Sequence, residues 1–200
     1  MKRLMTWLLA GFAAAFVATG VYAQETPDAL IKRVSSDVLA TLKSDKELQS
    51  GNKRKLYELI DTRIAGNFDF LRMTSLAMGR SWRTATPEQQ KVLADEFKQL
   101  LIRTYSGALA NYQSHVMDFK PLKMQPADTD VTVRTTVTAP GGQPIGIDYS
   151  MERTSGAWKA YDVIVGGVSL VTNYREEFSN AVRDVGVDGL IKQLQAKNKA

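Results

Sequence analysis

The spacing of hydrophobic residues changes at His115, and this change constrains the fold more than any other feature of the sequence. Before His115, apolar side chains recur every three or four residues, as on one face of a helix. After it, they alternate with polar residues, as in strands that bury one face. Helices grouped in one half and strands in the other indicate an α+β fold rather than an alternating α/β fold.

The first half contains four predicted helices. Thr26-Pro27 caps the first and Asn52 the second, and the third, around Met73, ends near Gly79. The fourth begins at Thr86-Pro-Glu-Gln89, a capping box with proline at the first helical position. Its apolar stripe continues for about 25 residues, or about 37 Å at 1.5 Å per residue. We expect this long helix to be the backbone of the core.

The second half contains a predicted antiparallel sheet of about four strands, followed by two helices. Two alternating segments flank the turn Ala139-Pro-Gly-Gly142, another strand runs from Ala157 to Val165, and a further one lies around Val116 to Met124. Gly186-Val-Asp-Gly189 separates the two closing helices. One face of such a sheet can lie on the helices while the other meets water.

The N-terminus has the order of features found in a secretory signal peptide. Met1-Lys-Arg precedes an apolar run from Leu8 to Ala18, and Val21-Tyr-Ala23 offers a small-residue cleavage site before Gln24. The run is shorter than the ~20 apolar residues that a membrane span requires. We therefore expect residues 1–23 to be a signal peptide and residues 24–200 to form a single domain. That domain lacks cysteine, so packing without disulfides must stabilise it.

The composition argues against an enzyme and against nucleic-acid binding. The chain has one histidine, no cysteine, no phosphate-binding loop and no metal-ligand spacing. Loss of Lys2 and Arg3 with the signal lowers the net charge from +5 to +3, and the remaining basic residues are mixed with acidic ones. His115 has no plausible catalytic partner nearby, so we interpret it as structural or exposed. A protein that binds an apolar ligand fits these features better.

Among the carboxylates, Asp162 is the strongest candidate for a catalytic residue. By simple alternation it shares a strand face with Trp158, Ala160 and Ile164, where it could act as a general base of the steroid-isomerase type. The alternative is a structural aspartate that pairs with an arginine or accepts backbone N–H bonds near Gly166-Gly167. We favour the structural role.

Four segments carry a family resemblance: Ser81 to Gln90, Phe97 to Leu109, Trp158 to Phe178, and Gly186 to Leu194. In order and spacing they resemble the MlaC, or toluene-tolerance, family of periplasmic phospholipid-binding proteins. The resemblance covers most of the chain beyond residue 23.

The resemblance implies an NTF2-like cone hollowed to hold the acyl tails of a glycerophospholipid, with the head group at its mouth and no cofactor besides this cargo. It implies a monomeric periplasmic shuttle that maintains outer-membrane lipid asymmetry. Its partners would be an outer-membrane lipoprotein–porin complex and an inner-membrane ABC transporter with a ring-forming lipid-binding subunit. The alternatives are an NTF2-like enzyme that uses Asp162 and a periplasmic lipoprotein chaperone.

A lipid pocket should be large, at or above the upper end of the usual range of about 300–1,000 Å³. Both faces of the strand that ends at Val165 are apolar, so alternation does not fix which one points inward; we assign Tyr161 and Val163 to the inward face together with Val165. The residues that we expect to line the pocket are Phe97, Leu100, Leu101, Tyr105, Leu109, Ile147, Tyr149, Met151, Tyr161, Val163, Val165, Val168, Val171, Tyr174 and Phe178.

Overall fold

The computed structural model describes residues 25–199, so the predicted signal peptide, residues 1–23, lies outside the described residues. The first half is helical, as predicted. Its elements are α1 (Pro27–Ser44), α2 (Lys46–Gln49), α3 (Lys53–Leu59), the π-helical turn η1 (Ile60–Ile64), the 3₁₀ turn η2 (Ala65–Asn67), α4 (Phe70–Met78), the 3₁₀ turn η3 (Gly79–Thr84), α5 (Pro87–Ala110) and the 3₁₀ turn η4 (Asn111–Ser114).

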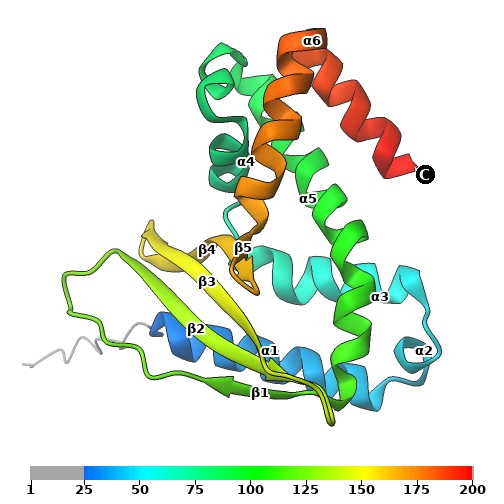
Figure 1. The fold of residues 1–200 in the computed structure, drawn as a ribbon, viewed down its shortest axis with the longest axis vertical. Helices are drawn as coiled ribbons and strands as arrows, with labels where there is room; N and C mark the ends of the chain where they lie inside the picture. Colours follow the sequence, from blue (N-terminus) through cyan, green and yellow to red (C-terminus); the bar gives the residue numbers. More distant parts are fainter. Residues whose placement is uncertain (1–24, 200) are drawn as a thin grey trace, which may run out of the picture.

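Local sequence explains where the longer helices begin. The Thr86 hydroxyl accepts the Gln89 backbone N–H at 3.2 Å, and the Gln89 side chain accepts the Thr86 N–H at 2.9 Å, which confirms the predicted capping box of α5. Asn52 caps α3 and Asp69 caps α4 through their side-chain oxygens. Thr26 occupies the N-cap of α1 without a side-chain cap bond. Helix α5 is 24 residues long and crosses most of the molecule (Figure 1).

The sheet is an antiparallel meander in the order β1-β2-β3-β4-β5, which confirms the α+β class. In the described part of the chain it has five strands rather than about four, because a two-residue strand after the Gly166-Gly167 turn pairs back on its predecessor. Helix α1 packs against one face of the sheet (Figure 1). The strands are β1 (Val116–Phe119), β2 (Asp130–Thr138), β3 (Ile145–Thr154), β4 (Ala157–Val165) and β5 (Val168–Ser169).

A β-bulge at Tyr161 changes the direction of side chains along β4. Ala160 pairs with Met151 and Asp162 pairs with Ser150, which leaves Tyr161 as one extra residue on β4. Directly paired residues share a face, so Ala160 lies on the Met151 face and Asp162 on the opposite one. The prediction that Asp162 shares a face with Ala160 was therefore wrong, because simple alternation does not include the inserted residue.

Helix α6 (Leu170–Lys199) consists of two arms joined at Gly186, as the glycine pattern predicted. Gly186 has φ 73° and ψ 179°, a conformation that interrupts the helix and that side chains disfavour. The second arm folds back beside the first (Figure 1), and the Lys197 ammonium pairs with Glu177 across the two arms. The Asn198 side chain donates to the Glu96 carbonyl at 2.9 Å, which ties the second arm to α5.

Within residues 25–199, buried apolar side chains form three clusters instead of one continuous core. Cluster 1 joins α4, α5 and α6 around Phe97 and Phe178, whose ring centroids lie 5.1 Å apart. Cluster 2 joins α1 to the sheet around Ile31 and Met151. Cluster 3 joins α1, α2, α3 and α5 around Leu42. All three clusters border one common cavity.

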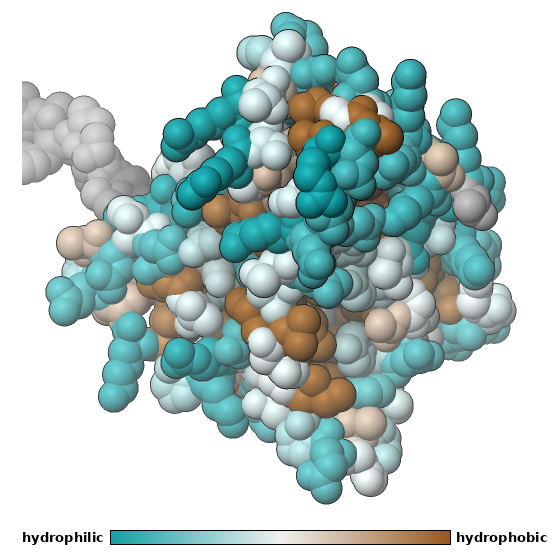
Figure 2. All heavy atoms as spheres, turned by 45° about the horizontal axis from the view of Figure 1, so that its top comes forward, coloured by the Kyte–Doolittle hydropathy of each residue, from teal (hydrophilic) through white to brown (hydrophobic). Residues whose placement is uncertain are grey.

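The face of the molecule drawn in Figure 2 carries little continuous apolar area. In Figure 2 the brown, apolar residues lie in separate patches divided by hydrophilic side chains. Across residues 25–199, no helix combines the length and hydropathy needed to cross a bilayer.

Candidate functional site

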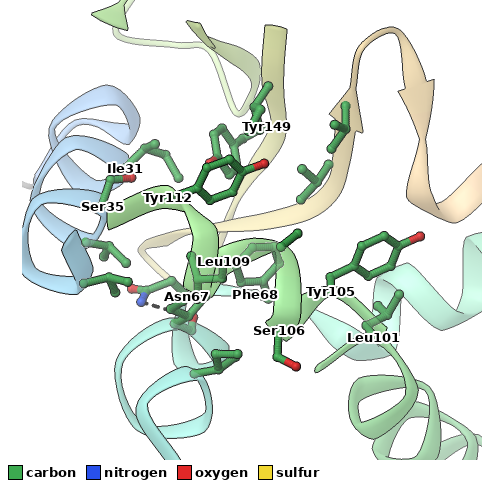
Figure 3. A pocket seen from close by; sticks show the side chains of 18 of the residues that line it. Ile31, Ser35, Asn67, Phe68, Leu101, Tyr105, Ser106, Leu109, Tyr112 and Tyr149 are labelled. Atoms are coloured by element: carbon green, nitrogen blue, oxygen red, sulfur yellow. Dashed lines mark hydrogen bonds between the residues drawn. The ribbon is translucent and has the colours of Figure 1, made fainter. Parts of the chain in front are cut away.

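A cavity of about 330 Å³ lies where the three clusters meet, between α1, the turns η1 and η2, α5 and the inner face of the sheet (Figure 3). Each cluster contributes to its wall: Met73 and Leu101 come from cluster 1, Ile31 from cluster 2 and Ile102 from cluster 3. The cavity is therefore built from elements far apart in sequence.

The wall of the cavity is apolar and uncharged. None of the described residues that line it is Asp, Glu, Lys or Arg. Two of its polar side chains already bond to nearby backbone: the Ser106 hydroxyl donates to the Arg103 carbonyl at 3.3 Å, and the Asn67 amide donates to the Arg63 carbonyl at 3.0 Å. Such a wall suits a hydrocarbon ligand, because a charged group of a ligand buried against it would find no residue of opposite charge.

Three tyrosines supply most of the remaining polarity. Burial raises the pKa of Tyr149 to about 12, with a smaller contribution from neighbouring Tyr112. Burial also raises the pKa of Tyr105, and Tyr174 adds to the effect. A raised tyrosine pKa keeps the phenol protonated at neutral pH, so these hydroxyls add hydrogen-bonding groups without adding charge.

His115 lines the cavity beside Tyr112, with the two rings edge to face at 4.9 Å between centroids. Its Nδ1 is buried and has no hydrogen-bond partner among the described residues. The structure therefore places the single histidine of the chain at this cavity.

Seven of the fifteen predicted pocket residues line this cavity. The long helix and the sheet face each other across it, as expected, with Tyr105 and Leu109 on α5 and Tyr149 on β3 (Figure 3). The bulge at Tyr161 explains why Val163 and Val165 turn inward, since they pair with Tyr149 and Ile147. The seven residues are Leu101, Tyr105, Leu109, Ile147, Tyr149, Val163 and Val165.

The structure places the other eight outside the cavity wall. Val168 is 59% exposed, on β5. Met151 belongs to cluster 2, and Tyr161 packs towards α4, under the Arg72 guanidinium at 4.5 Å. Five residues fill cluster 1, because the N-terminal half of α5 packs on α6 before α5 reaches the cavity: Phe97, Leu100, Val171, Tyr174 and Phe178.

The sequence interpretation missed the wall opposite the sheet and α5. The apolar stripe of α1 was visible at Ile31, Val34 and Val38, but the same spacing is typical of an ordinary core helix. The residues outside the predicted set are Ile31, Val34, Ser35, Val38, Leu39, Ile60, Ile64, Ala65, Asn67, Phe68, Phe70, Met73, Ile102, Ser106, Ala108, Tyr112, His115, Met117, Val137 and Leu170.

The volume of the cavity is smaller than predicted. At about 330 Å³ it lies near the lower end of the range for ligand sites, not at its upper end. Large aromatic side chains, among them Phe68, Tyr105 and Tyr112, take up space along the wall (Figure 3).

The Asp162 carboxylate links β4 to the start of α6 through hydrogen bonds. Its Oδ1 accepts the backbone N–H of Val163 at 2.8 Å and that of Val171 at 3.1 Å, and its Oδ2 accepts the Ser169 hydroxyl. Both carboxylate oxygens are therefore engaged within the chain, at the bend between the strand and the helix. This geometry supports the structural role.

We expect Asp162→Asn to lower the free energy of unfolding by about 1–3 kcal/mol, because the amide nitrogen cannot accept the bonds that a carboxylate oxygen accepts. Thermal melts followed by circular dichroism measure the loss. The bound ligand should stay unchanged, since Asp162 is not in the cavity wall. Asp118→Asn, on the exposed side of β1, serves as the control. A loss of enzymatic turnover in Asp162→Asn would contradict the structural assignment.

Comparisons of the sequence with known proteins identify a matching family and two relatives. Residues 32–196 match the family described as "MlaC protein". The chain is 28% identical to the toluene tolerance protein Ttg2D of Pseudomonas putida, over 94% of this chain and 85% of the relative. It is 20% identical to the intermembrane phospholipid transport system binding protein MlaC of Haemophilus influenzae, over 98% and 92% of the two chains.

The fold is also similar to a solved structure, the phospholipid-binding protein from Ralstonia solanacearum in complex with a phospholipid. The TM-score is 0.80 and the sequence identity 42%, and the match covers 88% of this chain and 98% of that one.

Proposed function

The chain belongs to the MlaC family, and from this membership we propose that it is a periplasmic carrier of glycerophospholipids. The cargo's acyl tails occupy the cavity, and residues 24–200 act as one lipid-binding domain. The observation that carries the proposal is the uncharged apolar cavity, in a fold that resembles a protein solved with a phospholipid bound.

The energetics explain why a dedicated carrier is needed. Burial of two acyl chains of about 16 carbons is worth roughly 25 kcal/mol at ~0.8 kcal/mol per CH₂. Release of such a lipid into water is negligibly slow, so a carrier must deliver its cargo while it is docked to a membrane complex. A cavity of about 330 Å³ must also widen to admit both chains. The division of the core into three clusters supports such widening. If α1 and α5 move apart, the apolar side chains of the three clusters are not all exposed to water at the same time.

The proposed route runs between the two membranes of the envelope. The lipid passes between an outer-membrane lipoprotein–porin complex and an inner-membrane ABC transporter with a ring-forming subunit, and the transfer maintains outer-membrane lipid asymmetry. The name of the Haemophilus relative, an intermembrane phospholipid transport system binding protein, supports such a system. The enzyme alternative loses its main argument, because Asp162 faces away from the cavity and its oxygens are engaged.

Organic extraction and mass spectrometry of protein purified from the periplasm test the function. We expect co-purified glycerophospholipid in near-stoichiometric amount, on a chain that begins at Gln24. A protein that carries no lipid, and takes none up from vesicles, would exclude the carrier function. An intact Met1 on a membrane-bound form would exclude the periplasmic location.

A further inference from the structure

A second, polar cleft adjoins the apolar cavity. It has a volume of about 360 Å³ and lies between α1 and the turns η1 and η2. Val34 and Asn67 line both the cleft and the cavity, so the two spaces adjoin at these side chains. The other lining residues of the cleft are Arg33, Asp37, Thr62, Arg63 and Gly66.

The boundary between the two spaces runs through a single stretch of backbone. Along η1 and η2, Arg63 and Gly66 border the cleft while Ile64 and Ala65 border the cavity. Part of this stretch is a π-helical turn, a rare conformation that is frequent at functional sites. Across this stretch the surroundings change from hydrocarbon-like on the cavity side to charged on the cleft side.

The charges of the cleft are separated rather than uniform. The Arg33 guanidinium forms a two-point pair with Glu25, at 2.8 and 2.9 Å, so its charge is already balanced. Arg63 is exposed and takes part in none of the ion pairs found within residues 25–199. Asp37 adds a negative charge on the α1 side, one helical turn from Arg33, whose pKa is raised by the Glu25 pair and, to a smaller extent, by the Asp37 carboxylate. The cleft thus presents the Arg63 cation on the η1 side, and the Asp37 anion beside the paired Arg33 on the α1 side.

We propose that this cleft is the head-group subsite of the cavity and that it takes a zwitterionic phosphoethanolamine group. Arg63 binds the phosphate, as guanidinium groups do through paired N–H donors, and Asp37 binds the ammonium group. Asn67 lies at the junction, at the level of the glycerol backbone. The assignment rests on the proposed lipid-carrier function and adds a head-group preference to it.

Loading from vesicles tests the two charges separately. Delipidated protein is incubated with equimolar phosphatidylethanolamine and phosphatidylglycerol, and the bound lipids are quantified by mass spectrometry. We expect Asp37→Asn to lower the ratio of ethanolamine to glycerol lipid by about twofold to fivefold, the range for an exposed ion pair. Arg63→Gln should lower the total lipid bound by a similar factor. Arg83→Gln, on the exposed face of η3, is the matched control and should leave both quantities unchanged.

A steric variant tests the position of the subsite independently of charge. A Cβ at Gly66 meets no atom within 4 Å, so Gly66→Leu fills the cleft without straining the fold. We expect severalfold less bound lipid at an unchanged melting temperature. Gly107→Leu is the matched control, because Gly107 has the same free space and borders neither the cleft nor the cavity.

The outcomes distinguish this inference from the function on which it rests. Wild-type protein that takes up no lipid overturns the carrier function itself. Wild-type protein that loads lipid while Asp37→Asn, Arg63→Gln and Gly66→Leu load the same amount in the same ratio overturns only the head-group subsite. Excess inorganic phosphate should leave the total lipid bound by the wild type unchanged; if it lowers that total to the level of Arg63→Gln, the cleft binds free phosphate instead.

Discussion

Val171→Glu is expected to destabilise the protein by about 4 kcal/mol or more, which is a large part of the total stability of about 5–15 kcal/mol typical of a domain. Val171 is 2% exposed and lies in cluster 1, near Phe97 and Phe178 and outside the cavity wall. A carboxylate there is shielded from water, and it also displaces packed side chains. Thermal and urea melts of the purified variant measure the loss.

Val92→Glu is the matched control for that result. Val92 lies on α5 and is 37% exposed, so the same charge is introduced where water reaches it, and we expect a change within about 0.5 kcal/mol. A Val171→Glu variant with the melting temperature of the wild type would mean that this face of α6 opens to solvent or ligand. The assignment of Val171 to a solid core would then be wrong.

The second large effect concerns Val163, where the same substitution should empty the protein without unfolding it. Val163 lines the cavity and is half-buried, and it belongs to none of the three clusters found within residues 25–199. Water can enter the cavity once the lipid leaves and can solvate the new carboxylate. While lipid is bound, the new carboxylate lies against acyl chains without a counter-ion, which makes binding of the lipid unfavourable. We expect at least a tenfold loss of bound lipid at a melting temperature close to that of the lipid-free wild type.

Val163→Leu provides the control for cavity shape, because it keeps the wall apolar and should retain most of the lipid. Extraction and mass spectrometry measure the lipid content, and circular dichroism measures folding. Wild-type lipid content in Val163→Glu would show that the tails do not reach this wall. Considered together, the Val163 and Val171 variants separate cavity from core with one chemical change.

The sequence predicted the helical elements well, because their signals are local. The capping box at Thr86 to Gln89, the asparagine cap at Asn52 and the break at Gly186 each depend on a few adjacent residues. The π-helical turn Ile60–Ile64 and the strand Val168–Ser169 were not predicted. Both arise from contacts with distant segments, and no short pattern in the sequence specifies them.

The candidate site was predicted less completely, for a physical reason. Cavity and core are lined by the same apolar side chains at the same spacings, so Tyr105 and Leu109 do not differ in pattern from Phe97 on the same helix. What separates them is the packing of other elements against each half of α5. Helix α1 forms the part of the cavity wall that the sequence did not predict. The apolar spacing around Val34 is the same for a helix that borders a cavity and for one that packs in a filled core.

The extra residue at Tyr161 has a consequence for protein engineering. Because it shifts the register between Ala160 and Asp162, the number of residues in β4, not only their chemistry, determines which side chains face the ligand. Deletion of this one residue would remove the bulge and leave Val163 opposite Tyr149, whereas regular pairing that keeps Tyr161 in the ladder would put Asp162 opposite Tyr149 and place an acid where a valine now lies. A designer who wishes to alter cargo selectivity here should therefore treat strand length as a variable in its own right.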